Sequence, residues 1–179
     1  MKPTAAAVLA SLVFQLASCS GTGSRPPATV SSLDKARYAG EWHEIARLPN
    51  FFEKGLVAAK ASYGVNDDGS ISVHNQGLRS DGKLTSIKGT ARPADPSAPG
   101  KLLVRFDAFP ANLFEGDYWI LDINPGYTRA LVGSPDYRFL WILDRNPMDK
   151  GDYQPQIRKA EQLGYNTGEL IFNPKRIPD

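Results

Sequence analysis

The feature that most constrains the fold of this chain is a succession of eight short segments with the composition of β-strands, separated by turn-forming residues. The turns are clearest at 66–69 (NDDG) and 80–83 (SDGK), where Asn, Asp and Gly favour tight hairpin connections. The predicted strands are 40–48, 57–65, 70–76, 84–92, 101–106, 118–123, 128–133 and 138–144. Closing eight antiparallel strands into a barrel removes the unpaired edges of an open sheet. We therefore expect residues 33–179 to form an all-β domain, an eight-stranded up-and-down antiparallel barrel.

The pattern changes after the eighth strand. The segment 155–164 begins with proline, ends with glycine and has apolar residues at helical spacing. These residues are Ile157, Ala160 and Leu163. Because the strand 138–144 is apolar on both faces, its outer face needs a cover, and we expect the helix to pack there, outside the barrel. A strand-like piece is expected at 170–172, and a single helical turn capped by Ser32 is expected at 32–37.

The N-terminus has the composition of an export signal. Residues 1–18 contain one early lysine and an apolar run, 5–17, that is shorter than the roughly 20 residues a membrane-spanning helix needs. The run ends in Leu-Ala-Ser followed by Cys19, the only cysteine, and these four residues resemble the bacterial lipobox. That resemblance implies that Cys19 is lipidated, with palmitate or a similar acyl chain, and that the protein is a lipoprotein; cleavage by the ordinary signal peptidase is the alternative. Ser20, in place of aspartate, favours the outer membrane by resemblance to enterobacterial lipoproteins, and 19–32 has the composition of a flexible tether.

Charge and motifs exclude several classes of function. The 21 basic and 19 acidic residues leave a formal charge of +2, which gives no electrostatic reason to expect nucleic-acid binding. The two histidines, His43 and His74, lie on different predicted strands, so we expect no metal site, and we expect no cofactor. Glu44 lies two residues after Trp42 on the same predicted strand, so it should point inward like Trp42. Two roles remain possible for it: a hydrogen-bonded structural carboxylate, or an acid/base group. We prefer the structural interpretation and expect a protein that is not an enzyme.

Three segments carry a resemblance to a known family. Residues 38–53 (YAGEWHEIARLPNFFE) resemble the first lipocalin signature, and 139–145 (FLWILDR) resemble the third. The second signature is only partly matched at 123–127 (INPGY), because Asn124 stands where aspartate is usual, and this puts a salt bridge from that turn in doubt. The resemblance covers roughly 33–174 and points to the group of bacterial outer-membrane lipocalins and apolipoprotein D. It implies the lipocalin barrel and the binding of a small apolar ligand.

The closed end of such a barrel needs a large apolar side chain held in one orientation. Gly40 and Trp42 of the first signature and Arg145 of the third are the residues we assign to this base. A guanidinium stacked on an indole gains about 0.5–2 kcal/mol of cation–π attraction. We interpret the pair as structural, and a ligand stacked on Trp42 is the alternative.

The open end is predicted from aromatic residues in loops. Phe51, Phe52, Phe109 and Phe114 are expected to surround the mouth, where they cover a pocket, meet a membrane or form a homodimer contact. The wall residues chosen by strand parity are Tyr63, Asn75, Phe106 and Tyr118, with simple core filling as the alternative. We expect a lipid-anchored carrier of a fatty acid, lysophospholipid or similar amphiphile, for transport or storage at the outer membrane. The rival hypotheses are an enzyme on the same barrel and a ligand-free module that binds a partner.

Overall fold

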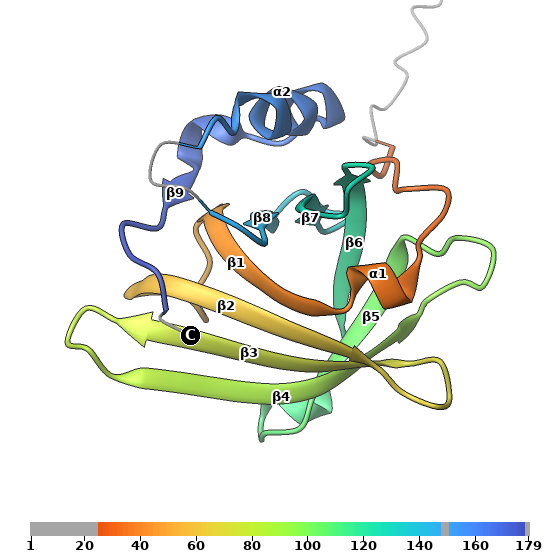
Figure 1. Cartoon of the computed structure of the whole chain (residues 1–179), viewed down its shortest axis with the longest axis horizontal. Helices are drawn as coiled ribbons and strands as arrows, with labels where there is room; N and C mark the ends of the chain where they lie inside the picture. Colours follow the sequence, from red (N-terminus) through yellow and green to blue (C-terminus); the bar gives the residue numbers. More distant parts are fainter. Residues whose placement is uncertain (1–24, 148–150, 178–179) are drawn as a thin grey trace, which may run out of the picture.

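Nine antiparallel strands make one sheet in the computed structural model, which describes residues 25–147 and 151–177. The strands are β1 (Gly40–Arg47), β2 (Leu56–Val65), β3 (Ile71–Arg79), β4 (Leu84–Pro93), β5 (Lys101–Phe106), β6 (Gly116–Ile123), β7 (Arg129–Gly133), β8 (Leu140–Asp144) and β9 (Ile171–Phe172). The helices are α1 (Lys35–Tyr38), α2 (Gln154–Leu163) and the 3₁₀ turns η1 (Ala111–Leu113) and η2 (Thr167–Glu169). Strands β1 to β8 form a closed up-and-down barrel, because β1 pairs with both β2 and β8 (Figure 1). The predicted eight-stranded barrel with a C-terminal helix is confirmed.

The barrel wall is continued by the C-terminal segment where β1 and β2 separate. β1 pairs with β2 only from Gly40 to His43, while its pairing with β8 continues to Arg47 through a register shift between Glu44 and Ala46. Beyond this point β9 pairs with β1. The backbone N–H of Asn173 then donates to Ile45 O at 2.9 Å, and that of Lys175 donates to Val57 O at 3.2 Å. The C-terminal segment thus bonds to both separated strands.

Apolar side chains form two clusters, one on each side of the barrel wall. The inner cluster contains Trp42, Tyr38, Tyr63, Ile71, Val73, Ala91, Leu102, Val104, Ile120, Val132 and Leu143. The outer cluster contains Trp119, Leu121, Leu131, Leu140 and Ile142 from β6–β8 and Ala160 of α2, with Ile157 and Leu163 packed against it. Figure 1 shows α2 outside the barrel, over these strands. The helix is therefore docked outside the barrel by the residues that its spacing predicted.

Two local details differ from the sequence-based expectation. The first helical turn is α1, and its N-cap is Asp34, whose carboxylate accepts the backbone N–H of Arg37 at 3.1 Å; the prediction of a Ser32 cap is wrong. Aspartate caps here because it lies one residue before the turn, the place from which its oxygen reaches the third N–H group. β3 extends to Arg79, three residues beyond the prediction, because β2 pairs with it along its whole length.

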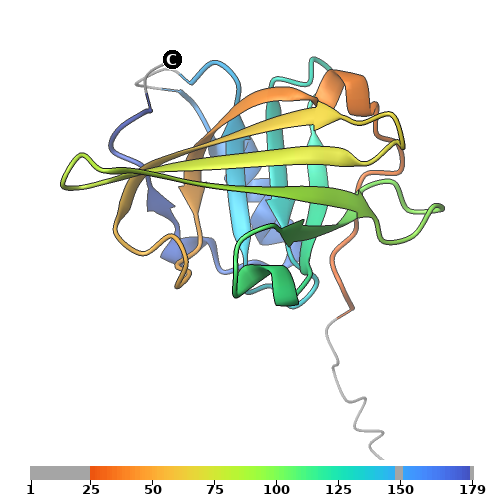
Figure 2. The same ribbon diagram turned by 90° about the horizontal axis from the view of Figure 1, so that it is seen from below.

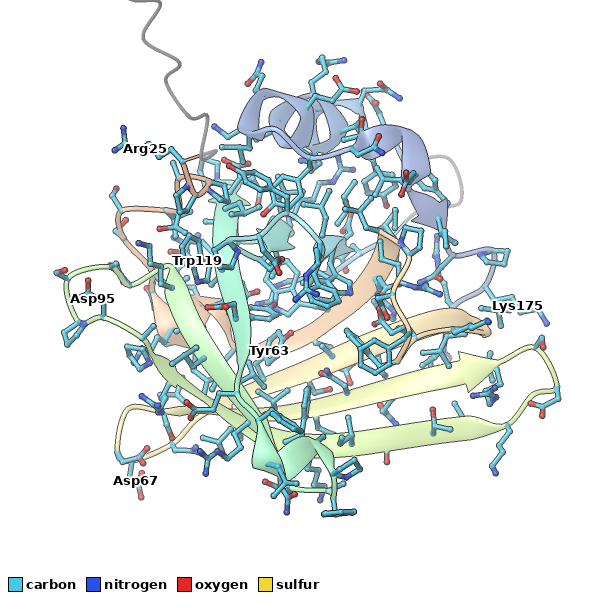
Figure 3. All side chains as sticks on the ribbon, turned by 180° about the vertical axis from the view of Figure 1, so that it is seen from behind. Arg25, Tyr63, Asp67, Asp95, Trp119 and Lys175 are labelled. Carbon is cyan, nitrogen blue, oxygen red and sulfur yellow. The ribbon has the colours of Figure 1, made fainter. Side chains whose placement is uncertain are left out.

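The two ends of the barrel are built by different loops. The loops 66–70, 94–100 and 124–128 lie at the end that holds α1 and Trp42, which we call the base. The loops 48–55, 80–83, 107–115 and 134–139 lie at the opposite end, which we call the mouth (Figure 2). Asp67 and Asp95 mark two of the base loops in Figure 3, on the same side of the molecule.

Part of the predicted tether lies on the barrel wall. Val30 donates its backbone N–H to Ile120 O at 3.0 Å, and Pro27 is buried. Arg25 is at the mouth end of this segment, where its carbonyl oxygen accepts a hydrogen bond from the Tyr137 hydroxyl. Residues 25–30 therefore run beside β6, from the mouth loop 134–139 toward the base (Figure 2). Residues 1–24, with Cys19 and the predicted signal peptide, are outside the described residues.

Candidate ligand site

The base of the barrel is sealed by Trp42. Its side chain is 0 % exposed, its indole Nε1 donates to Tyr38 O at 2.8 Å, and its ring lies 5.2 Å from that of Tyr38. The guanidinium carbon of Arg145 lies 4.1 Å from the centre of the Trp42 ring. The stacked pair that the signatures imply is present in the structure, at the end away from the mouth.

Arg145 fixes the chain segments around Trp42 by donating to backbone oxygens. Nε donates to Tyr127 O at 2.7 Å, and Nη2 donates to Arg37 O at 2.8 Å and Ala39 O at 2.7 Å. Gly40 has φ +98°, and a Cβ atom there would lie 2.9 Å from Arg145 Nη1. Glycine is therefore required at position 40 both for the backbone conformation and for the approach of the arginine.

The turn before β7 makes neutral hydrogen bonds in place of a salt bridge. Asn124 Oδ1 accepts the backbone N–H groups of Thr128 and Arg129 at 2.8 and 2.9 Å, and its Nδ2 donates to the Thr128 hydroxyl. Tyr127 adopts φ 55° and stacks under the Arg37 guanidinium at 4.3 Å. The asparagine thus closes the turn without the charge that aspartate would bring.

The inner wall becomes more exposed from base to mouth. Along β5, Leu102 is 1 % exposed, Val104 is 8 % exposed, and Phe106 is only partly buried. Along β3, Ile71 is 3 % and Val73 is 4 % exposed, whereas Asn75 is partly buried. These side chains alternate along each strand with side chains that point outward, so they all belong to the inward face. The increase in exposure from base to mouth is therefore a property of the inner wall. The inward side chains are consequently buried at the base and partly exposed toward the mouth.

Three tyrosine hydroxyls meet inside the barrel. Tyr118 Oη lies 2.7 Å from Tyr38 Oη and 2.9 Å from Tyr63 Oη (Tyr63 is labelled in Figure 3). Burial raises the pKa of Tyr63 to about 12, and burial also raises the pKa of Tyr118 well above its usual value, so these hydroxyls stay neutral. Tyr63 and Tyr118 were expected in the wall, whereas Tyr38 was not, because it precedes the first strand and strand parity does not place it.

Asn75 adds a polar atom without a partner to the same wall. It pairs with Ala61 of β2 and Ile87 of β4, and both its neighbours on this face of β3 are apolar or glycine. Its Oδ1 is buried and accepts no hydrogen bond from the described residues. A buried acceptor without a donor is costly, so a ligand that donates to it gains affinity.

A buried charged cluster lies where β1 and β2 separate. Arg47 Nη1 donates to Glu44 Oε1 and to Asn173 Oδ1, both at 2.7 Å, and Arg47 Nε lies 3.6 Å from Glu53 Oε2. Asn173 Nδ2 in turn donates to Glu44 Oε1 at 2.9 Å. Two carboxylates therefore share one guanidinium, with side chains of Glu44 and Arg47 that are 5 % and 4 % exposed.

The surroundings of Glu44 disfavour its ionised form. Burial, and then the nearby Glu53 carboxylate, raise the pKa of Glu44 from 4.5 to about 8 against the opposing effect of Arg47. Hydrogen bonds from Arg47 and Asn173 give the Glu44 carboxyl group partners within the fold. The structural interpretation of this group stays a prediction. Arg47, Glu53 and Asn173 were missed as its partners, since the register shift after Glu44 is what brings the side chains of residues 44 and 47 together.

The mouth phenylalanines are exposed on two loops. Phe51 is 84 % and Phe52 is 53 % exposed in the loop 48–55, and Phe109 is 78 % and Phe114 is 70 % exposed in the loop 107–115. Phe52 lies 6.4 Å from the ring of Trp141, whose Nε1 donates to Glu53 Oε2 at 3.1 Å. The aromatic loop 48–55 is thus connected to the charged cluster beneath it.

Two further features bear on function. In residues 25–147 and 151–177 no group of three or more His, Cys, Asp or Glu side chains is placed to hold a metal ion. Among the same residues no helix has the length and apolar character needed to cross a membrane.

Comparisons with known proteins agree with the geometry. The family model described as a lipocalin-like domain matches residues 33–175. Temperature-induced lipocalin-1 of Arabidopsis thaliana is 40 % identical over 152 residues, covering 82 % of this chain and 81 % of the relative. The outer membrane lipoprotein Blc of Escherichia coli K12 is 34 % identical, covering 91 % and 92 %, and apolipoprotein D of Macaca fascicularis is 36 % identical, covering 84 % and 79 %.

Solved structures show the same fold at lower identity. Insecticyanin from the tobacco hornworm Manduca sexta aligns with a TM-score of 0.63 at 21 % identity, covering 84 % of each chain. Lobster apocrustacyanin A1 aligns with a TM-score of 0.60 at 17 % identity, covering 83 % of this chain and 89 % of that one. At such identities the likeness concerns the fold alone.

Proposed function

The chain belongs to the lipocalin family, and from that premise we propose that it is a lipid-anchored carrier of a single-chain amphiphile, such as a fatty acid or lysophospholipid, at the outer membrane. The observation that carries the proposal is the gradient of exposure along the inner wall, from Leu102 at 1 % to the partly buried Phe106. An inner wall that is apolar and buried at one end and partly exposed at the other suits a molecule with an apolar tail and a polar head.

The wall offers both kinds of contact that an amphiphile needs. Phe106 and Val104 supply apolar surface, at about 25 cal/mol per Å² of area removed from water. The hydroxyl of Tyr118 and the unpaired Oδ1 of Asn75 supply polar contacts part of the way down. A ligand would enter tail first, leaving its head among the loops of the mouth.

Uptake of a fluorescent fatty-acid probe tests this function. We expect competing single-chain lipids to bind about fourfold more tightly per added methylene, which corresponds to about 0.8 kcal/mol for each one buried, until the barrel takes up no more of the chain. Asn75→Trp fills the inner wall and should weaken binding at least about tenfold, because the indole occupies ligand volume. Thr90→Trp, an exposed outward position on the adjacent β4, is the matched control and should leave the affinity unchanged.

The outcome that contradicts the carrier proposal is equally clear. If the folded wild-type protein takes up no probe, or if affinity does not depend on chain length, the barrel is a filled module that binds a partner by its surface. Circular dichroism of each variant separates loss of binding from loss of folding.

The anchor is proposed to be Cys19. It is the only cysteine of the chain, and several matched relatives carry the name outer membrane lipoprotein. Cys19→Ala should release the protein into the soluble fraction while the barrel still folds, because acyl chains supply the membrane affinity. Fractionation after a carbonate wash measures this. A variant that stays in the membrane pellet would show that the sulfur carries no anchor.

A further inference from the structure

Exposed apolar side chains are concentrated at the mouth. Nine large hydrophobic residues are exposed among those that the structure describes, and six lie on or next to three mouth loops. They are Phe51, Phe52, Leu84, Phe109, Leu113 and Phe114, with exposures from 53 to 84 %, and we call this set the apolar rim. Of the other three, Ile171 and Phe172 lie on β9, and Val65 lies at the base. The asymmetry indicates that the mouth, and not the base, meets an apolar partner.

The shape of the apolar rim restricts what that partner is. The loops 48–55 and 107–115 stand on different parts of the mouth (Figure 2). Each loop carries exposed phenylalanines of its own. Separate projecting phenylalanines around an opening suit a soft, continuous apolar phase into which each inserts. Aromatic and leucine side chains on a lipid surface bury themselves at the boundary of head groups and acyl chains.

The path of the N-terminal segment points to the same partner. Val30 is bonded to β6, and Arg25 is bonded to Tyr137 of the mouth loop 134–139, so the described chain begins at the mouth. Cys19 precedes Arg25 by six residues, which span at most about 20 Å when extended. An acyl anchor on Cys19 would therefore keep the mouth loop 134–139 within reach of the membrane surface.

Charge at the mouth is mixed in sign. Lys54 and Lys83 are exposed on the mouth loops, and so are Asp81 and Asp107. Arg138 pairs with Asp136 in the loop 134–139. Such a surface has no net attraction for anionic head groups, so contact with a bilayer would depend on the apolar rim.

We propose that the barrel docks mouth down on a lipid bilayer, with the apolar rim inserted among the head groups, so that an amphiphile passes between bilayer and barrel without crossing water. This inference rests on the proposed function for the anchor and for the cargo. It identifies the lipid surface as the partner of the apolar rim and as the source of the ligand. A second copy of the chain is the competing partner.

Photo-crosslinking tests the docking. The full acylated chain is reconstituted into vesicles of phosphatidylcholine containing a photoactivatable phospholipid, with or without phosphatidylglycerol. We expect adducts in 48–55 and 107–115, none in 66–70 or 94–100, and equal yields with and without the anionic lipid. Combining Phe51→Ser, Phe109→Ser and Phe114→Ser should lower the yield at least about tenfold, while Val65→Ser, the matched apolar deletion at the base, should not change it.

Each result separates the docking from the anchor. The full chain with Cys19→Ala should give fewer adducts, and these should lie at the same loops. For the acylated protein, adducts spread over both ends of the barrel would contradict the docking, although the anchor would still hold the protein on the vesicle. If sedimentation shows a dimer that the triple serine variant dissociates, with adducts unchanged, the apolar rim joins two copies and the docking is wrong. Circular dichroism checks that the variants are folded.

Discussion

Trp42→Ala is expected to lower the free energy of unfolding by about 3–5 kcal/mol, the range for deleting a large aromatic side chain from a core. The side chain is 0 % exposed, donates a hydrogen bond to Tyr38 O and carries the Arg145 guanidinium on its face. Its removal leaves a cavity at the base and takes away the surface on which Arg145 rests. Urea denaturation followed by circular dichroism measures the change.

Two further variants show whether the base acts as a unit. Trp141→Ala deletes the same side chain near the mouth, where the residue is only partly buried, and should cost clearly less. Arg145→Lys keeps the charge but loses the planar guanidinium that donates to Tyr127 O, Arg37 O and Ala39 O. It should lower the free energy of unfolding by about 1–3 kcal/mol. If Trp42→Ala costs no more than Trp141→Ala, Trp42 is not the plug of the barrel.

Raising the pH from about 5 to about 8 is expected to destabilise the fold through Glu44. The ordinary pKa of a glutamate side chain is 4.5, and that of Glu44 in the folded protein is about 8, because burial and the Glu53 carboxylate oppose ionisation. Between these two values the folded state holds a proton that the unfolded state has lost, so stability falls as pH rises through this window and is constant above it. At about 1.4 kcal/mol per pKa unit, the difference between the two pKa values corresponds to a loss of at most about 5 kcal/mol in the free energy of unfolding.

Glu44→Gln isolates the contribution of Glu44 to this pH dependence. Glutamine keeps a neutral side chain that can accept from Arg47 and Asn173, so the variant should match the wild type near pH 5 and exceed its stability at pH 8. The measurement is the free energy of unfolding of both proteins across this range. Parallel pH profiles for the two proteins would mean that Glu44 is ionised in the folded state at neutral pH.

Much of the barrel could be predicted because its causes are local. Alternating apolar residues and Asn/Asp/Gly turns define strands and hairpins within a few residues, so the eight strands were located to within a few positions. The inward direction of Phe106 and Tyr118 followed from parity, and the exposure of Phe51 and Phe109 followed from their place in loops. The packing of α2 outside the barrel was predictable for two reasons. The helix has apolar residues at helical spacing, and the predicted strand 138–144 has an apolar outer face that needs a cover.

The sequence by itself thus determined the eight-stranded barrel and the Trp42–Arg145 base, whereas the tertiary structure decided the charged cluster and the path of the N-terminal segment. The register shift after Glu44 is set by the closure of the whole barrel, and it breaks the parity from which inward residues are inferred. Asn173 reaches Glu44 from 129 residues away, a contact without any local signal. Val30 binds Ile120 although its segment has the composition of a tether, because a backbone N–H group will pair with any free carbonyl that the fold brings near it.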